Sequence, residues 1–203
     1  MANHATIKTA PILENSEALL AQLEHHEWYH PSVQRMGESR LREWLAVRVL
    51  LKETLGEEKQ IVYSELGKPY LADGSHHISI SHTKGYVAIA IDRQYPVAID
   101  IERISPRVEN IRSRFISEEE ENHLSKTHRL THLLLHWSAK ESLFKMMDAP
   151  GIEFKTQLHI HPFEPVLNEW SKFTAHETRT AQQAEVTVRY IVAEDYVLTV
   201  IVG

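Results

Sequence analysis

The chain has no cysteine among its 203 residues. This absence excludes disulfide bonds, thiol nucleophiles and zinc sites built on cysteine ligands. The sequence also has no run of about 18 apolar residues, so no membrane-spanning helix is expected. The amino terminus, Met1–Thr6, lacks a charged stretch followed by an apolar segment, and we therefore expect a cytoplasmic protein without membrane attachment.

Positive charge is scarce as well. The chain has 22 lysine and arginine residues against 28 aspartate and glutamate residues, a formal net charge of -6. This balance argues against a general nucleic-acid-binding protein. A composition of 42% hydrophobic and 25% charged residues is typical of a soluble globular protein, and the length suits one large domain or two small ones.

One apolar run ends in two acidic residues, Asp100 and Glu102. In Val97–Glu102 the residues alternate in the manner of a strand, and residues two apart lie on the same face of a strand. Aspartate is rare in strands, and neighbouring carboxylates raise each other's pKa. The pattern therefore predicts a compensating cation, and a hard, oxygen-seeking ion such as Mg2+ fits.

About forty residues later, the stretch Leu130–Met147 predicts a long helix. Glu141 falls within its apolar arc and is expected to face inward, where a carboxylate is costly unless it is paired or metal-bound. Lys145 lies one turn further on, at the edge of the arc, and Lys140 lies on the other side of Glu141. The apolar arc consists of Leu130, Leu133, Leu134, Trp137 and Phe144.

Taken singly, these patterns are ordinary, because an acidic strand face is most often solvated and an exposed helical ion pair contributes only about 0.3–0.5 kcal/mol. Their order in one chain is more specific. The chain contains, in succession, Gly67-Lys68-Pro69, Ser81-His82-Thr83, the Asp100-x-Glu102 strand and Trp137-x-x-Lys140-Glu141-x-x-x-Lys145. This set resembles the 4'-phosphopantetheinyl transferases, specifically their larger class of a little over 200 residues. The resemblance covers roughly Arg48 to Lys145, with Ala98 where the family often has glycine.

The resemblance implies a role for each matching residue. Asp100, Glu102 and Glu141 would hold Mg2+. Lys145 would neutralise the pyrophosphate of coenzyme A, assisted by Lys140. The remaining contacts with coenzyme A would come from Ser81 and His82 at phosphate, Lys68 and Pro69 beside the adenine, and Arg48 at the 3'-phosphate.

The implied reaction is transfer of phosphopantetheine from coenzyme A to a serine of an acyl or peptidyl carrier protein, with release of 3',5'-ADP. Glu141, directly or through a water molecule, would accept the serine proton. The nucleophile belongs to the partner. We expect a monomer whose partners are coenzyme A and the apo carrier protein.

The order of expected elements indicates two similar halves. Helices are predicted at about Ser16–Glu27 and Glu38–Leu55, followed by short strands at Gln60–Ser64, His77–Ser81 and Tyr86–Asp92. After Pro96 the order repeats in outline, with a strand at Val97–Glu102, a short capped helix near Ser117, the long helix, and strands at Leu158–His161, Glu185–Ala193 and Tyr196–Val202.

We therefore predict an α+β fold made of two similar halves. Residues 1–95 would contact coenzyme A, and residues 96–203 would carry the metal site and the carrier-docking surface. The resemblance implies the same arrangement, a pseudo-dimer with its active site in the cleft between the halves.

Histidine supplies a rival interpretation. His128, His132 and His136 are spaced four residues apart, as in a zinc-binding helix stripe. The helical projection puts them opposite the apolar arc, so we expect a solvated stripe. A His-rich metal-binding module and a non-catalytic module that binds coenzyme A or a carrier are the alternatives to the transferase.

A cluster of arginines near the acidic strand is the expected docking surface for an acidic carrier protein. It consists of Arg103, Arg107, Arg112 and Arg114. Pairing of these arginines with the nearby acidic run Glu118–Glu121 explains the same pattern equally well.

Overall fold

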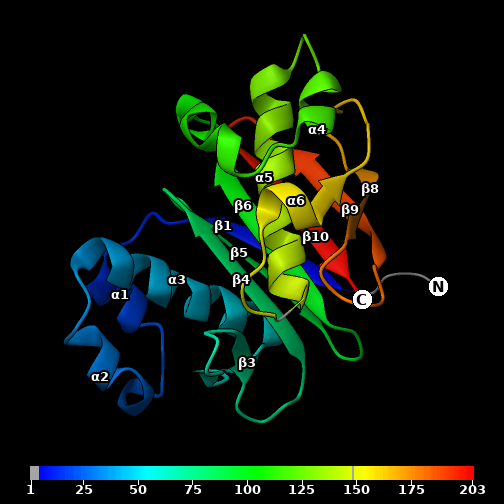
Figure 1. Ribbon diagram of the computed structural model, residues 1–203. Coiled ribbons are helices and arrows are strands. Elements are labelled where there is room, and N and C mark those ends of the chain that lie inside the picture. Colours follow the sequence, from blue (N-terminus) through cyan, green and yellow to red (C-terminus); the bar gives the residue numbers. More distant parts are fainter. Residues whose placement is uncertain (1–4, 148) are drawn as a thin grey trace. The chain divides into compact units, whose positions relative to one another are not determined.

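The computed structural model describes residues 5–147 and 149–203. Residues Met1–His4, which entered the expectation of a missing targeting segment, lie outside this part. The chain divides into two compact units, Met1–Tyr95 and Pro96–Gly203. Helices and antiparallel strands are mixed in both units (Figure 1), which confirms the α+β class. No helix in the described ranges is both long and apolar enough to cross a membrane.

The first unit packs one long helix against a small antiparallel sheet. Its sheet has the order β1-β5-β4, and β2 pairs with β3 in a separate hairpin. Apolar side chains of α3 and β5 form its core. The elements are β1 (Thr6–Pro11), α1 (Ser16–Leu20), η1 (His26–Trp28), α2 (His30–Val33), α3 (Glu38–Leu55), β2 (Ile61–Tyr63), β3 (Pro69–Leu71), β4 (His77–Thr83) and β5 (Tyr86–Asp92).

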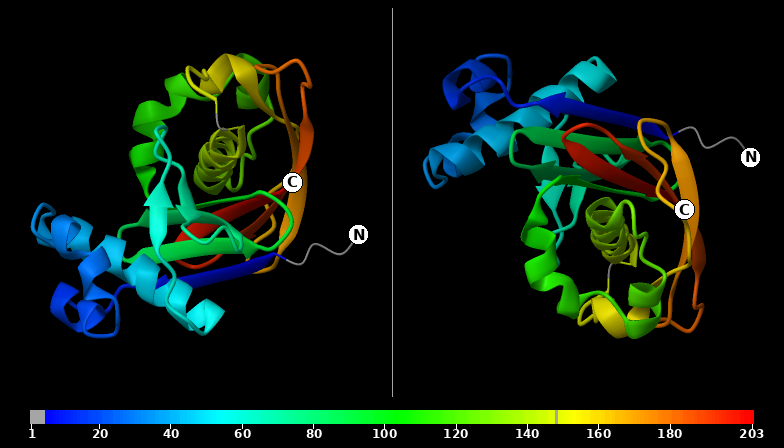
Figure 2. Two further views of the ribbon diagram at one scale, coloured as in Figure 1. Left: turned by 90° about the horizontal axis from the view of Figure 1, so that it is seen from below. Right: turned by 90° about the horizontal axis from the view of Figure 1, so that it is seen from above.

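The second unit has a five-stranded antiparallel sheet in the order β6-β10-β9-β8-β7. Figure 2 shows the outer strands of this sheet curving around one side of α5. The elements are β6 (Val97–Arg103), η2 (Pro106–Arg114), α4 (Glu118–Asn122), α5 (Arg129–Met147), α6 (Phe154–Gln157), β7 (Leu158–Ile160), β8 (Ser171–Glu177), β9 (Glu185–Val192) and β10 (Tyr196–Val202).

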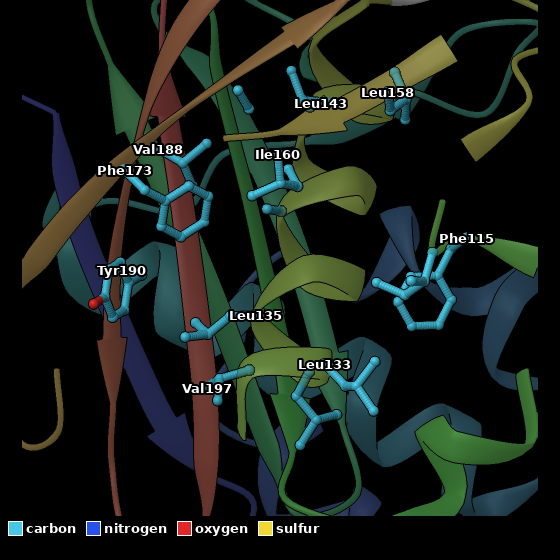
Figure 3. Close-up of a cluster of buried hydrophobic side chains, with 14 of the residues drawn as sticks. Phe115, Leu133, Leu135, Leu143, Leu158, Ile160, Phe173, Val188, Tyr190 and Val197 are labelled. Carbon is cyan, nitrogen blue, oxygen red and sulfur yellow. The ribbon is translucent and has the colours of Figure 1, made fainter. Parts of the chain in front are cut away.

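The core of the second unit lies between α5 and the sheet. Leu135 of α5 lies beside Val197 of β10, and Val188 of β9 lies beside Phe173 of β8 (Figure 3). Phe115 belongs to the segment that joins η2 to α4. Each large apolar side chain that is buried contributes about 1.5–3 kcal/mol to folding, so the buried residues of α5 hold this helix against the sheet. Phe144, predicted within the inward arc, is instead 40% exposed.

Several predicted boundaries are confirmed. The helix at Glu38–Leu55 ends at Gly56, whose φ of 77° is the left-handed conformation that glycine adopts without strain. The capping box at Ser117 is present, with Ser117 and Glu120 bonded reciprocally. The predicted strands at Tyr86–Asp92 and Tyr196–Val202 match β5 and β10.

The helix predicted at Ser16–Glu27 is wrong in length. Asn15 caps α1 as expected, but α1 ends at Leu20. The carboxylate of Glu58 accepts bonds from the backbone N–H groups of Glu24 and His25. In a continuous helix these groups would donate to carbonyls four residues earlier, so beyond α1 the distant carboxylate takes the place of intrahelical partners.

Candidate functional site

The acidic strand and the long helix of the second unit lie side by side. Ala98, Asp100 and Glu102 form one face of β6, as the alternation predicts, and Ala98 belongs to the core under α5. Trp137 of α5 donates its indole N–H to Glu102 Oε1 at 2.7 Å. Lys145 Nζ donates to Asp100 Oδ1 at 2.9 Å and to the Ile99 carbonyl at 2.8 Å.

The three predicted acidic residues share one electrostatic environment. Burial, followed by the charge of Asp100, raises the pKa of Glu102 to about 7. The same two causes raise the pKa of Glu141 to about 7. Lys145 is the cation that acts against both shifts. The structure therefore brings Lys145 into contact with Asp100 and places Glu102 and Glu141 close enough for their pKa values to respond to both charges.

This donor set suits a divalent cation in its chemistry, because carboxylate oxygens are the ligands of hard ions and the group carries excess negative charge. The side chains are otherwise engaged, Asp100 by Lys145 and Glu102 by Trp137. Within residues 5–147 and 149–203, no group of three or more histidine, aspartate or glutamate side chains is arranged to hold a metal ion.

Lys140 does not fit its predicted place at the pyrophosphate. Its side chain is 0% exposed and its ammonium group donates to Glu120 Oε2 at 2.8 Å and to the carbonyls of Phe115 and Phe154 at 2.6 and 3.0 Å. All three ammonium hydrogens are thus in use. The expectation that Lys140 assists at a phosphate is wrong, and the residue joins η2, α4 and α6 to the long helix instead.

The predicted solvated histidine stripe is also wrong. His132 and His136 are only 1% and 3% exposed, and both pack against Phe163. Each ring has a structural bond, since His132 accepts from the Ser125 N–H and His136 bonds the His132 carbonyl. Burial lowers the pKa of both rings to about 4. A zinc stripe on an open helix face is therefore not supported.

In the first unit, Lys68 and Pro69 lie at the β2–β3 hairpin. Gly67 has a φ of 81°, and Ser64 closes the turn by bonding the N–H groups of Gly67 and Lys68. Ser81 and His82 lie on β4, with Ser81 buried and His82 partly exposed. The hairpin and the strand hold these predicted residues on two different elements of one unit.

Arg48 does not fit an exposed 3'-phosphate contact. It is 4% exposed, its guanidinium lies 3.1 Å from the centroid of the Trp44 ring, and it donates to the Trp44 carbonyl and the Tyr63 hydroxyl. Burial lowers the pKa of the group. The prediction for Arg48 is therefore corrected: this arginine is part of an aromatic core.

Sequence reasoning missed Arg40, which lies two helical turns before Arg48. Arg40 Nη1 is 2.6 Å from His82 Nε2, and His82 Nδ1 is 3.2 Å from Glu43 Oε2. Because arginine only donates, Nε2 accepts and Nδ1 carries the proton toward Glu43. A helix-surface arginine has no local signal that pairs it with a histidine some forty residues away, so only the fold reveals the pair.

The four arginines of the predicted docking surface differ in their contacts. Arg112 pairs with Glu121 at 3.2 Å and lies 3.9 Å from Glu109, and Arg129 binds the same two acids. Arg112 is therefore engaged within the unit, as the alternative interpretation expected. Arg103, Arg107 and Arg114 remain exposed side chains.

Comparison with known proteins identifies the family to which the chain belongs. The family model of the 4'-phosphopantetheinyl transferase superfamily matches residues 96–201, which is more than half of the chain. The chain belongs to this superfamily, and the resemblance seen in the motifs is confirmed.

Individual relatives agree with this assignment. A 4'-phosphopantetheinyl transferase of Bacillus subtilis is 39% identical over 108 residues, covering 47% of this chain and 48% of that protein. The 4'-phosphopantetheinyl transferase Sfp of Bacillus subtilis strain 168 is 31% identical over 126 residues, covering 55% and 56%. AcpT of Escherichia coli K12 is 38% identical over 69 residues, covering 34% and 35%. The chain spans about half the length of the Bacillus relatives it matches.

Proposed function

We propose that the chain transfers 4'-phosphopantetheine from coenzyme A to a serine of an acyl or peptidyl carrier protein, releasing 3',5'-ADP. The observation that carries this proposal is the group Asp100, Glu102, Glu141 and Lys145, which lies inside the region that matches the family. In the reaction, the serine oxygen forms a bond to the β-phosphorus of coenzyme A. The bond from that phosphorus to the bridging oxygen of the ADP moiety breaks.

Each residue of the group has a role in this proposal. Asp100, Glu102 and Glu141 would hold Mg2+, which when bound polarises the phosphoryl group and offsets charge on the leaving phosphate. Lys145 meets the pyrophosphate, since its ammonium already lies at the edge of the carboxylates. Glu141, directly or through water, accepts the proton of the carrier serine.

The first unit would supply the contacts to the rest of coenzyme A. Lys68 and Pro69 flank the adenine, Ser81 and His82 contact phosphate, and Arg40 takes the place first expected of Arg48. Arg40 Nη1 lies 2.6 Å from His82 Nε2, so a phosphate bound by the remaining N–H groups of Arg40 would lie beside His82. The carrier would dock at the exposed arginines near β6, which are Arg103, Arg107 and Arg114.

We propose that the two units act as a pseudo-dimer with the active site between them. The support is their common topology: in each, a strand precedes the long helix, and that first strand pairs antiparallel with the last. The protein would act as a monomer in the cytoplasm, with residues 1–95 contacting coenzyme A and residues 96–203 carrying the metal and docking the carrier.

Mass spectrometry of an apo carrier protein tests the proposal. The carrier is incubated with this protein, coenzyme A and Mg2+, and we expect its mass to increase by one phosphopantetheine group. Chelation of the metal should stop the increase. Binding of coenzyme A or of the carrier without any mass increase would indicate a non-catalytic binding module instead.

A further inference from the structure

A threonine interrupts the apolar row of β10 that faces α5. Val197 and Ile201 of this row belong to the hydrophobic core, and Thr199 lies between them with 0% of its surface exposed. Its partner across the strand pair is Asp100. A hydroxyl group in such a place is unfavourable unless it forms hydrogen bonds, so its partners show what the residue does.

The Thr199 hydroxyl bonds two serines of the long helix. Thr199 Oγ1 is 2.9 Å from Ser138 Oγ and 2.8 Å from Ser142 Oγ, and both serines are completely buried. Ser138 Oγ also lies 3.3 Å from the Asp100 carbonyl. One order of donation, from Ser142 to Thr199, from Thr199 to Ser138 and from Ser138 to the Asp100 carbonyl, uses each hydroxyl proton once.

The two serines are direct neighbours of the residues that complete the acidic site. Ser138 follows Trp137, which donates to Glu102, and Ser142 follows Glu141. A side chain bonded at two points one turn apart fixes both the rotation of a helix about its axis and its position along a strand. Apolar packing alone has no such directional preference.

We propose that Thr199 is a positioning residue, which sets α5 on β6 and β10 so that Glu141 and Lys145 meet Asp100 and Glu102. Its effect on turnover rests on the proposed transferase activity. Its effect on the placement of the helix does not, and this difference allows the two ideas to be tested separately.

The test uses Thr199→Val, which keeps the shape of the side chain and removes the hydroxyl, and Thr199→Ser, which keeps the hydroxyl. Thr187→Val is the matched control, because Thr187 is exposed on β9 and pairs with Thr174. The structural readout is the indole N–H resonance of Trp137 in a 15N spectrum, assigned by Trp137→Phe. The chain has only four tryptophans, so the resonances can be separated.

We expect Thr199→Val to shift the Trp137 resonance and to lower kcat by about tenfold to a hundredfold, because small misplacement of catalytic groups is costly. The unfolding midpoint should fall, because Ser138 and Ser142 lose a buried partner, while the KM for coenzyme A should stay near the parent value. Thr199→Ser should restore both resonance and kcat, and Thr187→Val should change neither.

An unchanged Trp137 resonance in Thr199→Val, or equal impairment of Thr199→Ser, would overturn the proposal. If Thr199→Val does not fold, Ser142→Ala removes the same bond from the helix side and is read out in the same way. If the parent protein transfers no phosphopantetheine, the proposed function fails, and the Trp137 resonance still decides whether Thr199 positions the helix.

Discussion

The two units use the same strand pairing for different purposes. In the first unit, Lys8 of β1 pairs with Ile89 of β5, and Ile89 packs in the core against α3. In the second unit, Asp100 of β6 pairs with Thr199 of β10. Under its long helix the first unit therefore has Ile89 in an apolar core, whereas the second has a carboxylate and a hydroxyl at a paired position. Polar groups at this position reduce the buried apolar area that stabilises the fold, and they form part of the acidic site instead.

The largest effect should come from the carboxylate that distinguishes the second unit. Asp100→Ala is expected to reduce transfer at least about a thousandfold, since it removes a metal ligand and the partner of Lys145. The fold should persist, because the substitution relieves repulsion with Glu102 and Glu141. Carrier mass spectra and thermal unfolding are measured together, with exposed Glu118→Ala as control. Near-parent transfer by Asp100→Ala would remove it from the metal site.

Substitution of Lys140 and of Lys145, both in α5, should affect stability and turnover to different extents. Lys140→Met should lower the free energy of unfolding by about 3–5 kcal/mol, because it leaves Glu120 buried without its cation. Lys145→Met should cost less stability than Lys140→Met, because Lys145 is partly exposed beside the buried Asp100, and it should lower kcat more than it weakens coenzyme A binding. Urea unfolding and steady-state kinetics on both variants check this. If Lys145→Met acts only on KM, Lys145 does not meet charge that develops in the transition state.

Acid should act on the second unit through its buried histidines. Burial holds the pKa of His132 and His136 near 4, whereas the unfolded chain protonates histidine near 6.5. At these two rings the unfolded state therefore binds more protons, and their contribution to stability falls as the pH drops from about 6.5 to about 4. The loss amounts to roughly 3 kcal/mol for each ring. Glu102 and Glu141, whose pKa is raised to about 7, act in the opposite direction over much of this range.

Urea unfolding at several pH values measures this slope. His132→Gln removes one titrating ring, so on lowering the pH from about 6.5 to about 4 it should lose less stability than the parent does. An equal slope in this variant and in the parent would show that other groups cause the acid sensitivity.

In the first unit the expected effects concern ligand choice. Arg40→Ala and His82→Ala should each reduce the preference for coenzyme A over its 3'-dephospho form by about tenfold, as loss of a charge-assisted bond implies. Arg48→Lys is the contrasting variant, since Arg48 is held by Trp44 and Tyr63; it should lower stability and leave the preference intact. If only Arg48→Lys changes the preference for coenzyme A over its 3'-dephospho form, Arg48 contacts the 3'-phosphate as the sequence predicted.

The smallest effect should lie on the docking surface. Reversal of both Arg112 and Arg114 to glutamate is expected to slow transfer to the carrier several-fold at low salt and less at high salt. Arg114→Glu alone is the cleaner variant, because Arg112 pairs with Glu121. Coenzyme A binding should be unaltered. Unchanged carrier kinetics at low salt would place docking elsewhere on the surface.

The sequence predicted correctly those helices whose ends are determined by residues close together in the chain. The helix Glu38–Leu55 and its cap at Gly56 follow from residues close together in the chain, and so does the capping box at Ser117. The acidic strand and Glu141 were found because their periodicity places carboxylates where apolar residues are expected. These features need no knowledge of the partner element.

The failures share a dependence on distant residues. Beyond the short α1, Glu58 accepts hydrogen bonds from two backbone N–H groups that a longer helix would use internally. The histidines of α5 are buried because Phe163, from a loop beyond β7, covers the face that a single apolar arc leaves open. β1 was missed since its pattern is largely exposed and its pairing is with β5, some eighty residues later. None of these contacts has a signal within one helical turn or strand.

The pairing of β6 with β10 also determines when the site can form during synthesis. Asp100 leaves the ribosome roughly a hundred residues before Thr199, its cross-strand partner. At a translation rate of about 5–20 residues per second, β10 is made roughly 5–20 seconds after β6. During that interval α5 has been made but has no β10 row to pack against. The hydrogen bonds of Ser138 and Ser142 with Thr199 can therefore form only after translation reaches β10.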